Sequence, residues 1–180
     1  PDGNTFNVSC QMGFNTNATF RNFQLTDGTA KDYLGFGAGV RNLPSSFPAH
    51  LGEHSTDEAA AFTRQINQRW GINKFTAIPD QKISLTSHRS YDVGGWKIGN
   101  ITNLNWSTEY DYSETVNNNY IAYDVKNDVS RPRFEYNDIR YKNTSKLGAL
   151  FNWSFQRDGS KYELRNFFSQ RGVSALTQRE

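Results

Sequence analysis

The sequence predicts an all-β protein built from about five antiparallel strands that run up and down one sheet. Three observations support this fold class. Apolar and polar residues alternate over long segments, tight-turn sequences separate those segments, and 36% hydrophobic and 14% aromatic residues are combined with abundant Asn, Ser and Thr. This composition is typical of strands with one wet face rather than of a packed helical core.

The clearest alternation runs over residues 96–112. One side collects aromatic and aliphatic residues, and the other collects charged residues, amides and hydroxyls, with Ile101 as the exception. A second strand at 145–157 repeats this pattern, with Leu150 as its exception. The apolar residues are Trp96, Ile98, Leu104, Trp106, Tyr110 and Tyr112 in the first strand and Leu147, Ala149, Phe151, Trp153 and Phe155 in the second.

Tight turns punctuate the chain at three places. Asp158-Gly159 supplies the two positive-φ positions that a type I′ hairpin turn requires. Asp92-Val93-Gly94-Gly95 is a second turn, and Pro1-Asp2-Gly3-Asn4 leads into a further alternating segment. The strands predicted between and after these turns are 4–23, 82–91, 96–112, 145–157 and 160–171.

The other two connections, residues 24–81 and 113–144, are expected to be long loops. Short turns at one rim and long loops at the other are typical of outer-membrane barrels, and the strands exceed the usual five or six residues of a soluble sandwich, by about twofold. The sequence therefore predicts that residues 1–180 form part of one transmembrane up-and-down β-barrel domain in the bacterial outer membrane. Its apolar face would contact outer-membrane lipid and its polar face a watery lumen.

The first long connection contains the one helix that the sequence predicts, at about residues 56–70. Ser55-Thr56-Asp57-Glu58 fits a capping box, and Gly71 is a suitable C-terminal stop. We expect this short helix to lie within an extracellular loop, with one face formed by Ala59, Phe62, Ile66 and Trp70.

Charge and cysteine content exclude several other classes. The net charge is +2 with no run of Lys or Arg, so a nucleic-acid partner is not expected. The single cysteine, Cys10, excludes an internal disulfide framework and a CxxC redox or zinc motif. No phosphate-binding glycine loop, catalytic triad or carboxylate pair can be assigned. The sequence therefore predicts neither an enzyme nor a bound cofactor.

The segment His50-Leu51-Gly52-Glu53-His54 matches the HxxEH pattern of one class of zinc peptidases. That chemistry needs both imidazoles on one face of a continuous helix. Here Pro48 precedes the segment, Gly52 lies inside it, and the predicted helix begins only after Ser55. We therefore expect a polar loop rather than a metal site.

Aromatic residues in the first long connection are the candidate ligand-binding residues. Such side chains can stack on a sugar or a peptide. Packing of one loop against another is the alternative explanation for the same residues. The candidates are Tyr33, Phe36, Phe47 and Trp70.

One stretch of this connection resembles a known family. Asp32-Tyr33-Leu34-Gly35-Phe36-Gly37-Ala38-Gly39-Val40-Arg41-Asn42-Leu43-Pro44, preceded by Thr19-Phe20-Arg21-Asn22-Phe23, resembles an extracellular segment of TonB-dependent outer-membrane receptors of the SusC-like type, which carry a carboxypeptidase-like regulatory extension. The resemblance implies an internal fragment of a 22-stranded barrel. Because the chain has about five strands, the plug and the TonB contact would lie in other parts of the receptor.

The resemblance also implies a function. Such a receptor takes up a nutrient, which can be an oligosaccharide, a peptide or a chelated metal, with energy from the TonB complex and sometimes with a SusD-like surface lipoprotein as partner. Two alternatives remain open: a soluble β-sandwich domain that binds carbohydrate as lectins do, and a secreted zinc hydrolase that uses His50, Glu53 and His54.

Overall fold

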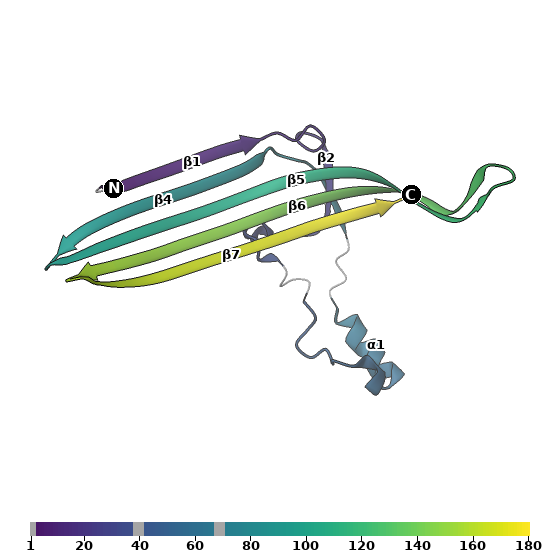
Figure 1. The fold of residues 1–180 in the computed structure, drawn as a ribbon. Helices are drawn as coiled ribbons and strands as arrows, with labels where there is room; N and C mark the ends of the chain where they lie inside the picture. Colours follow the sequence, from purple (N-terminus) through teal and green to yellow (C-terminus); the bar gives the residue numbers. More distant parts are fainter. Residues whose placement is uncertain (1–2, 38–41, 67–70) are drawn as a thin grey trace.

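The computed structural model describes residues 3–37, 42–66 and 71–180, and strands dominate them. Five strands form one antiparallel sheet in the order β1-β4-β5-β6-β7, so strands that follow one another in this sheet are neighbours (Figure 1). The all-β, antiparallel prediction is therefore confirmed. The strands are β1 (Thr5–Gly13), β4 (Asp80–Val93), β5 (Trp96–Asp124), β6 (Val129–Arg157) and β7 (Ser160–Arg179).

Two tight hairpin turns lie at the same end of this sheet (Figure 1). Asp158 and Gly159 have φ angles of 48° and 81°, and Gly94 and Gly95 have φ angles of 56° and 79°. These are the positive values of a type I′ turn, whose twist matches that of the flanking strands. Both turn predictions are confirmed, whereas the predicted turn at residues 1–4 lies partly outside the described residues.

The prediction of a long loop at residues 113–144 is wrong. This segment is the distal part of the β5–β6 hairpin, which continues beyond the sheet as a two-stranded ribbon and turns between Asp124 and Val129 (Figure 1). A register shift around Tyr120 interrupts the pairing. Such a bulge breaks the two-residue period, so alternation in the sequence cannot reveal the strands on either side of it.

The single strand predicted at residues 4–23 is divided in two. β1 ends at Gly13, and a turn follows in which the backbone N–H groups of Ala18 and Thr19 donate to the Asn15 carbonyl. β2 (Asn22–Thr26) then leaves the main sheet and pairs with β3 (Ile72–Thr76). The alternation at residues 4–23 does not show this change of partner, because both strands have the same period.

Within the described residues, the connection predicted as a loop at residues 24–81 also holds the 3₁₀ helices η1 (Ala30–Leu34) and η3 (Leu51–Glu53) and the helix α1 (Thr56–Arg64). The capping box is confirmed, since Ser55 Oγ accepts from the Glu58 backbone N–H and the Glu58 carboxylate accepts from the Ser55 N–H. The helix is shorter than predicted, because it ends at Arg64 with Gln65 as its C-cap. Residues 67–70 lie outside the described part of the chain.

The five-stranded sheet has two chemically different faces. Pairing aligns apolar residues of neighbouring strands, for example Leu85 with Leu104 and Leu104 with Ala149. The face that carries them is called the apolar face, and the opposite one the polar face. Along β5 the polar face carries Lys97, Gly99, Ile101, Asn103, Asn105, Ser107, Glu109 and Asp111.

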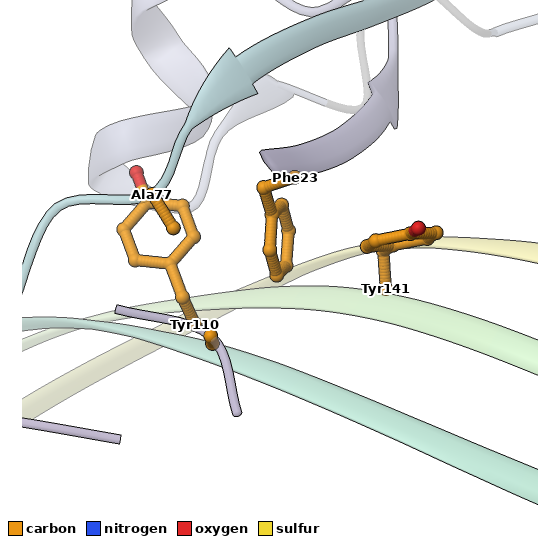
Figure 2. Close-up of a cluster of buried hydrophobic side chains, with 5 residues drawn as sticks. Phe23, Ala77, Tyr110 and Tyr141 are labelled. Atoms are coloured by element: carbon orange, nitrogen blue, oxygen red, sulfur yellow. The ribbon is translucent and has the colours of Figure 1, made fainter. Parts of the chain in front are cut away.

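The buried core lies at one end of the apolar face. Residues 14–37 and 71–79, which include β2, η1 and β3, fold over this end and are called the cap. The fully buried Phe23 ring inserts between Tyr110 and Tyr141, with edge-to-face ring distances of 5.4 and 5.2 Å (Figure 2). Ala18 and Ala77 complete this cluster.

Candidate functional site

The candidate functional site is the sheet surface itself, because the described residues leave most of the apolar face exposed. The part from Trp96, next to the tight turns, to Trp106 of β5 is called the apolar band, and the cap reaches its end at Trp106. Ten residue steps correspond to about 33 Å along the strand, or about 25 Å in height at a typical barrel tilt. Exposed members of the band include Val8, Ile83, Tyr91, Val93, Leu104, Phe151, Tyr162 and Leu164.

Three polar residues within the apolar band form hydrogen bonds with one another or with the backbone. Asn100 Nδ2 donates to the Asn152 carbonyl, and Thr102 Oγ1 donates to Asn100 Oδ1. Asn166 Nδ2 donates to the Phe151 carbonyl. Paired amides and hydroxyls cost much less to remove from water than unpaired ones. These bonds lower the cost of placing Asn100, Thr102 and Asn166 in an apolar environment, whereas Arg89, which pairs with Asn100, places a charged side chain on the same face.

The polar face carries ion pairs near the capped end of the sheet, beyond the level of Trp106. Lys142 Nζ lies 3.1 Å from Asp111 Oδ2, and Lys146 Nζ lies 3.1 Å from Glu109 Oε1. Because all four side chains are partly or fully exposed, these pairs add little stability and are better suited to contact with water. The chemistry of the polar face is thus suited to a surface in contact with water.

The cap is held on the apolar face by backbone and aromatic contacts. Trp106 Nε1 donates to the Tyr33 carbonyl at 2.5 Å, and Gln170 Nε2 donates to the Gly35 carbonyl at 2.7 Å. Gly35 has a φ of 81°, and a Cβ placed on Gly172 would lie 2.6 Å from the Gly35 Cα. Only glycines allow the two backbones to approach this closely.

Burial and charge shift the pKa of two groups where the cap meets the sheet. Burial raises the pKa of the Asp80 carboxyl, a hydrogen bond from the Tyr110 N–H opposes the shift, and Glu109 and Asp111 add to it. Burial also raises the pKa of the Tyr110 hydroxyl, and its neighbours Tyr33 and Asp80 raise it further. The Tyr110 phenol is therefore neutral throughout the physiological pH range.

A third group with a shifted pKa, the Asp138 carboxyl, lies where β7 ends. Both Asp138 oxygens accept from Arg179, Oδ1 from Nε at 2.7 Å and Oδ2 from Nη2 at 2.8 Å. This bidentate contact lowers the pKa of Asp138, and Asn117 lowers it further. The pair fastens the end of the edge strand to β6.

The three candidate ligand-binding aromatics within the described residues lie in two different places. Tyr33 and Phe36 lie in the cap, where Phe36 stacks on Phe168 of β7 with a ring distance of 6.2 Å. Phe47 instead packs near α1, 6.4 Å from the Phe62 ring. Trp70 lies outside the described residues. Tyr33 and Phe36 are thus brought together on the sheet, and Phe47 is separated from them; their role in ligand binding stays a prediction.

The HxxEH segment is not a continuous helix. Leu51–Glu53 form one 3₁₀ turn, and α1 starts only at Thr56. His54 packs on Phe62 and lies 3.8 Å from the Glu58 carboxylate. Across residues 3–37, 42–66 and 71–180, no group of three or more His, Cys, Asp or Glu side chains could hold a metal ion.

Two of the recesses that the described residues form adjoin the sheet near its opposite ends. One, of about 230 Å³, lies between the cap and the sheet and is lined by Leu25, Tyr33, Phe75, Tyr110 and Asn143. The other, of about 290 Å³, opens near the tight turns and is lined by His88, Asn152, Lys161, Glu163 and Arg165. Both fall below the size of typical small-molecule sites, about 300–1,000 Å³.

In the described part of the chain, no helix is long and apolar enough to cross a membrane.

The residues that fix the cap were missed in the sequence. Phe23 was assigned to a long strand, and Gly172 was not distinguished from other glycines. Asp138, which holds the end of β7, falls within the loop predicted at residues 113–144. A glycine in the continuing alternation of β7 is the one available signal, because an isolated strand glycine often marks a close backbone approach.

No known family model, curated protein or solved structure matches this chain. The two faces of the sheet and the attachment of the cap therefore provide the evidence for function.

Proposed function

We propose that this chain is a segment of the wall of a bacterial outer-membrane β-barrel receptor, which takes up a nutrient with energy from the TonB complex and without covalent chemistry. The apolar band contacts outer-membrane lipid, and the polar face lines a watery lumen. Contact with TonB occurs through other parts of the receptor, and a SusD-like lipoprotein is a candidate partner at the cell surface.

The observation that carries the barrel proposal is the exposed apolar band on a sheet whose other face is polar. Its height of about 25 Å matches the apolar belt of outer-membrane barrels. Trp96 and Tyr162 lie toward the tight turns and Trp106 toward the other end, whereas Trp153, which pairs with Asn100, lies near the middle of the band. Aromatic side chains at both edges of the belt are typical of such barrels, because amphipathic rings favour the membrane interface.

A soluble β-sandwich has less support. It would need a second layer over the whole apolar face. Within the described residues, the β2–β3 sheet covers the end around Tyr110 and Tyr141, whereas Phe151 and Leu164 remain 46% and 55% exposed. Patches of this kind on soluble proteins are interaction sites or aggregation liabilities.

The lone cysteine provides a direct test of the barrel proposal. Cys10 is exposed on the apolar face, and its neighbour Gln11 lies on the polar face. The chain, refolded into phosphatidylcholine vesicles, is labelled at Cys10 with an environment-sensitive fluorophore. The matched control is the Cys10→Ser/Gln11→Cys variant, labelled in the same way, with far-UV circular dichroism to verify the strands.

We expect blue-shifted emission and quenching by chain-spin-labelled lipid at position 10, and quenching by aqueous iodide at position 11. Equal iodide quenching at both positions would contradict lipid contact. So would a monodisperse, folded chain in plain buffer whose label at Cys10 is protected without lipid, which is the result expected of a sandwich.

The receptor part of the proposal rests on the resemblance at residues 19–48 and needs a separate test. Deletion of the gene in the source bacterium should abolish growth on one nutrient class, when oligosaccharides, peptides and chelated iron are supplied in turn as limiting nutrients. Complementation should restore growth only while the TonB complex is intact. Growth restored equally without TonB would contradict energised uptake.

A further inference from the structure

The cap overlaps one end of the apolar band. Phe36 stacks on Phe168, which pairs with Ala149, and Ala149 pairs with Leu104. Leu104 lies two residues inside the band limit at Trp106. The part of the cap nearest the tight turns therefore overlaps the Trp106 end of the surface that we assign to lipid.

The cap exposes its own apolar side chains next to this edge. Phe14 continues the apolar face of β1 beyond Met12, and its ring lies 6.2 Å from Phe20. Phe14 and Phe20 are 68% and 66% exposed. Exposed large apolar residues elsewhere in the cap are Tyr33, Leu34, Phe36, Ile72, Phe75 and Ile78.

The backbone holds Phe20 in an unfavourable conformation. Its φ is 61°, a value that is uncommon for a bulky residue other than glycine. The Phe20 N–H donates to the Ala77 carbonyl, and the preceding Ala18 and Thr19 are buried. Strain of this kind persists where the surrounding structure fixes it, and here it presents an aromatic ring to the exterior.

Cations accompany these aromatic residues. Arg21, Lys31 and Lys74 are exposed in the cap. Its two carboxylates take part in local contacts, since Asp27 accepts from Asn73 and Asp32 accepts from the Thr29 N–H. Aromatic residues next to exposed cations are suited to the boundary between acyl chains and anionic headgroups.

We infer that the cap is an interfacial anchor, which places Phe14 and Phe20 at the boundary between the headgroups and acyl chains of the outer leaflet. This inference rests on the proposed function, because it uses the same apolar face as the lipid-facing side. It adds that the segment following β1 lies against lipid outside the barrel and does not close over the lumen.

Site-specific depth measurements test this inference. In a Cys10→Ser background, Phe20→Cys and Phe14→Cys are labelled separately with bimane in vesicles of phosphatidylethanolamine and phosphatidylglycerol. Lys126→Cys, at the tip of the β5–β6 hairpin, is the water-exposed control. In a separate sample, the unmodified sequence is labelled at Cys10 and reports the environment of the band itself. Quenchers are lipids brominated near the headgroup, lipids brominated near the chain end, and aqueous iodide.

We expect the labels at positions 14 and 20 to be quenched more by shallow than by deep brominated lipid, and to lose most of the iodide quenching seen at position 126. Full iodide quenching at both cap positions, with Cys10 still quenched by lipid, would overturn the anchor and leave the barrel proposal intact. Iodide quenching at Cys10 as well would overturn both. Two cap positions are used so that one misfolded variant does not decide the result.

Discussion

The two ends of the apolar face carry the same residue types in very different surroundings. At the capped end, Tyr110 and Tyr141 are 3% and 7% exposed, whereas Phe151 and Leu164 in the uncovered band are about half exposed. Both ends alternate with polar residues in the same way. The chain therefore covers one end of this face with its own cap. In our proposal this is the extramembrane end, and lipid covers the remainder.

Removal of the central ring of the capped end should have the largest effect. Phe23→Ala leaves a cavity between Tyr110 and Tyr141, and large-to-small changes at buried aromatic positions cost about 3–5 kcal/mol. We expect hydrogen exchange in β2 and β3 to accelerate strongly, as measured by mass spectrometry. Phe151→Ala is the matched control at the uncovered end and should leave β2 and β3 protected. Equal acceleration by both variants would remove the distinction between the two ends.

A charge in the uncovered band is expected to have the next largest effect. Phe151 lies near the middle of the band, where a lysine facing lipid costs about 2–4 kcal/mol. Urea unfolding from vesicles should show this loss for Phe151→Lys. Ser154→Lys, on the polar face of the same strand, should change the free energy of unfolding by less than about 0.5 kcal/mol. A comparable loss for both would mean that the two faces contact the same environment.

A methyl group at the contact between cap and strand should have a smaller effect. Gly172→Ala would bring its Cβ within 2.6 Å of the Gly35 Cα, so the cap must shift. Overpacking of this kind costs about 1–3 kcal/mol. Faster exchange at residues 30–37 is the expected readout. Gly52→Ala, with no atom within 4 Å of the added group, is the control that should change nothing; unchanged exchange for Gly172→Ala would show that the contact does not hold the cap.

The smallest expected effect is a pH-dependent loosening at the end of β7. The Arg179 guanidinium lowers the pKa of Asp138 below its ordinary value of 3.8, so the pair is fully stabilising above that value and is lost as pH falls through the lower folded pKa. Exchange of the Asn137 and Glu180 amides, which bond to each other's carbonyls, should therefore rise in acid.

Asp138→Asn should show that faster exchange already at neutral pH and should lose the acid dependence. An acid dependence that persists in this variant would assign the titration to another group. Exchange in β2 and β3 should remain unchanged, which separates this effect from loss of the cap.

The sequence predicted those parts of the fold whose signals are local. Alternation over 96–112 and the Asp158-Gly159 turn identified strands and hairpins, because each depends on residues a few positions apart. The ribbon beyond Tyr112 could not be predicted in this way, since a bulge near Tyr120 interrupts its period.

The candidate site depended on contacts that alternation cannot reveal. Phe23 was expected in a long strand that continues β1, but its environment is set by β5 and β6. Among the candidate ligand-binding aromatics, Tyr33 and Phe36 pack with the sheet and Phe47 packs with α1. Whether one of these aromatic residues contacts a ligand depends on how the loops pack in three dimensions. Residue type alone does not determine this.

The Asp158-Gly159 turn also has a kinetic consequence. It joins β6 and β7 through a minimal loop, so this pairing has very low contact order and can form within microseconds, as isolated hairpins do. The cap instead depends on contacts such as Gln24 with Tyr141, which are 117 positions apart. Loop closure over that separation costs more entropy. We expect this hairpin to form early and the cap to dock later, onto a surface that the hairpins have already built.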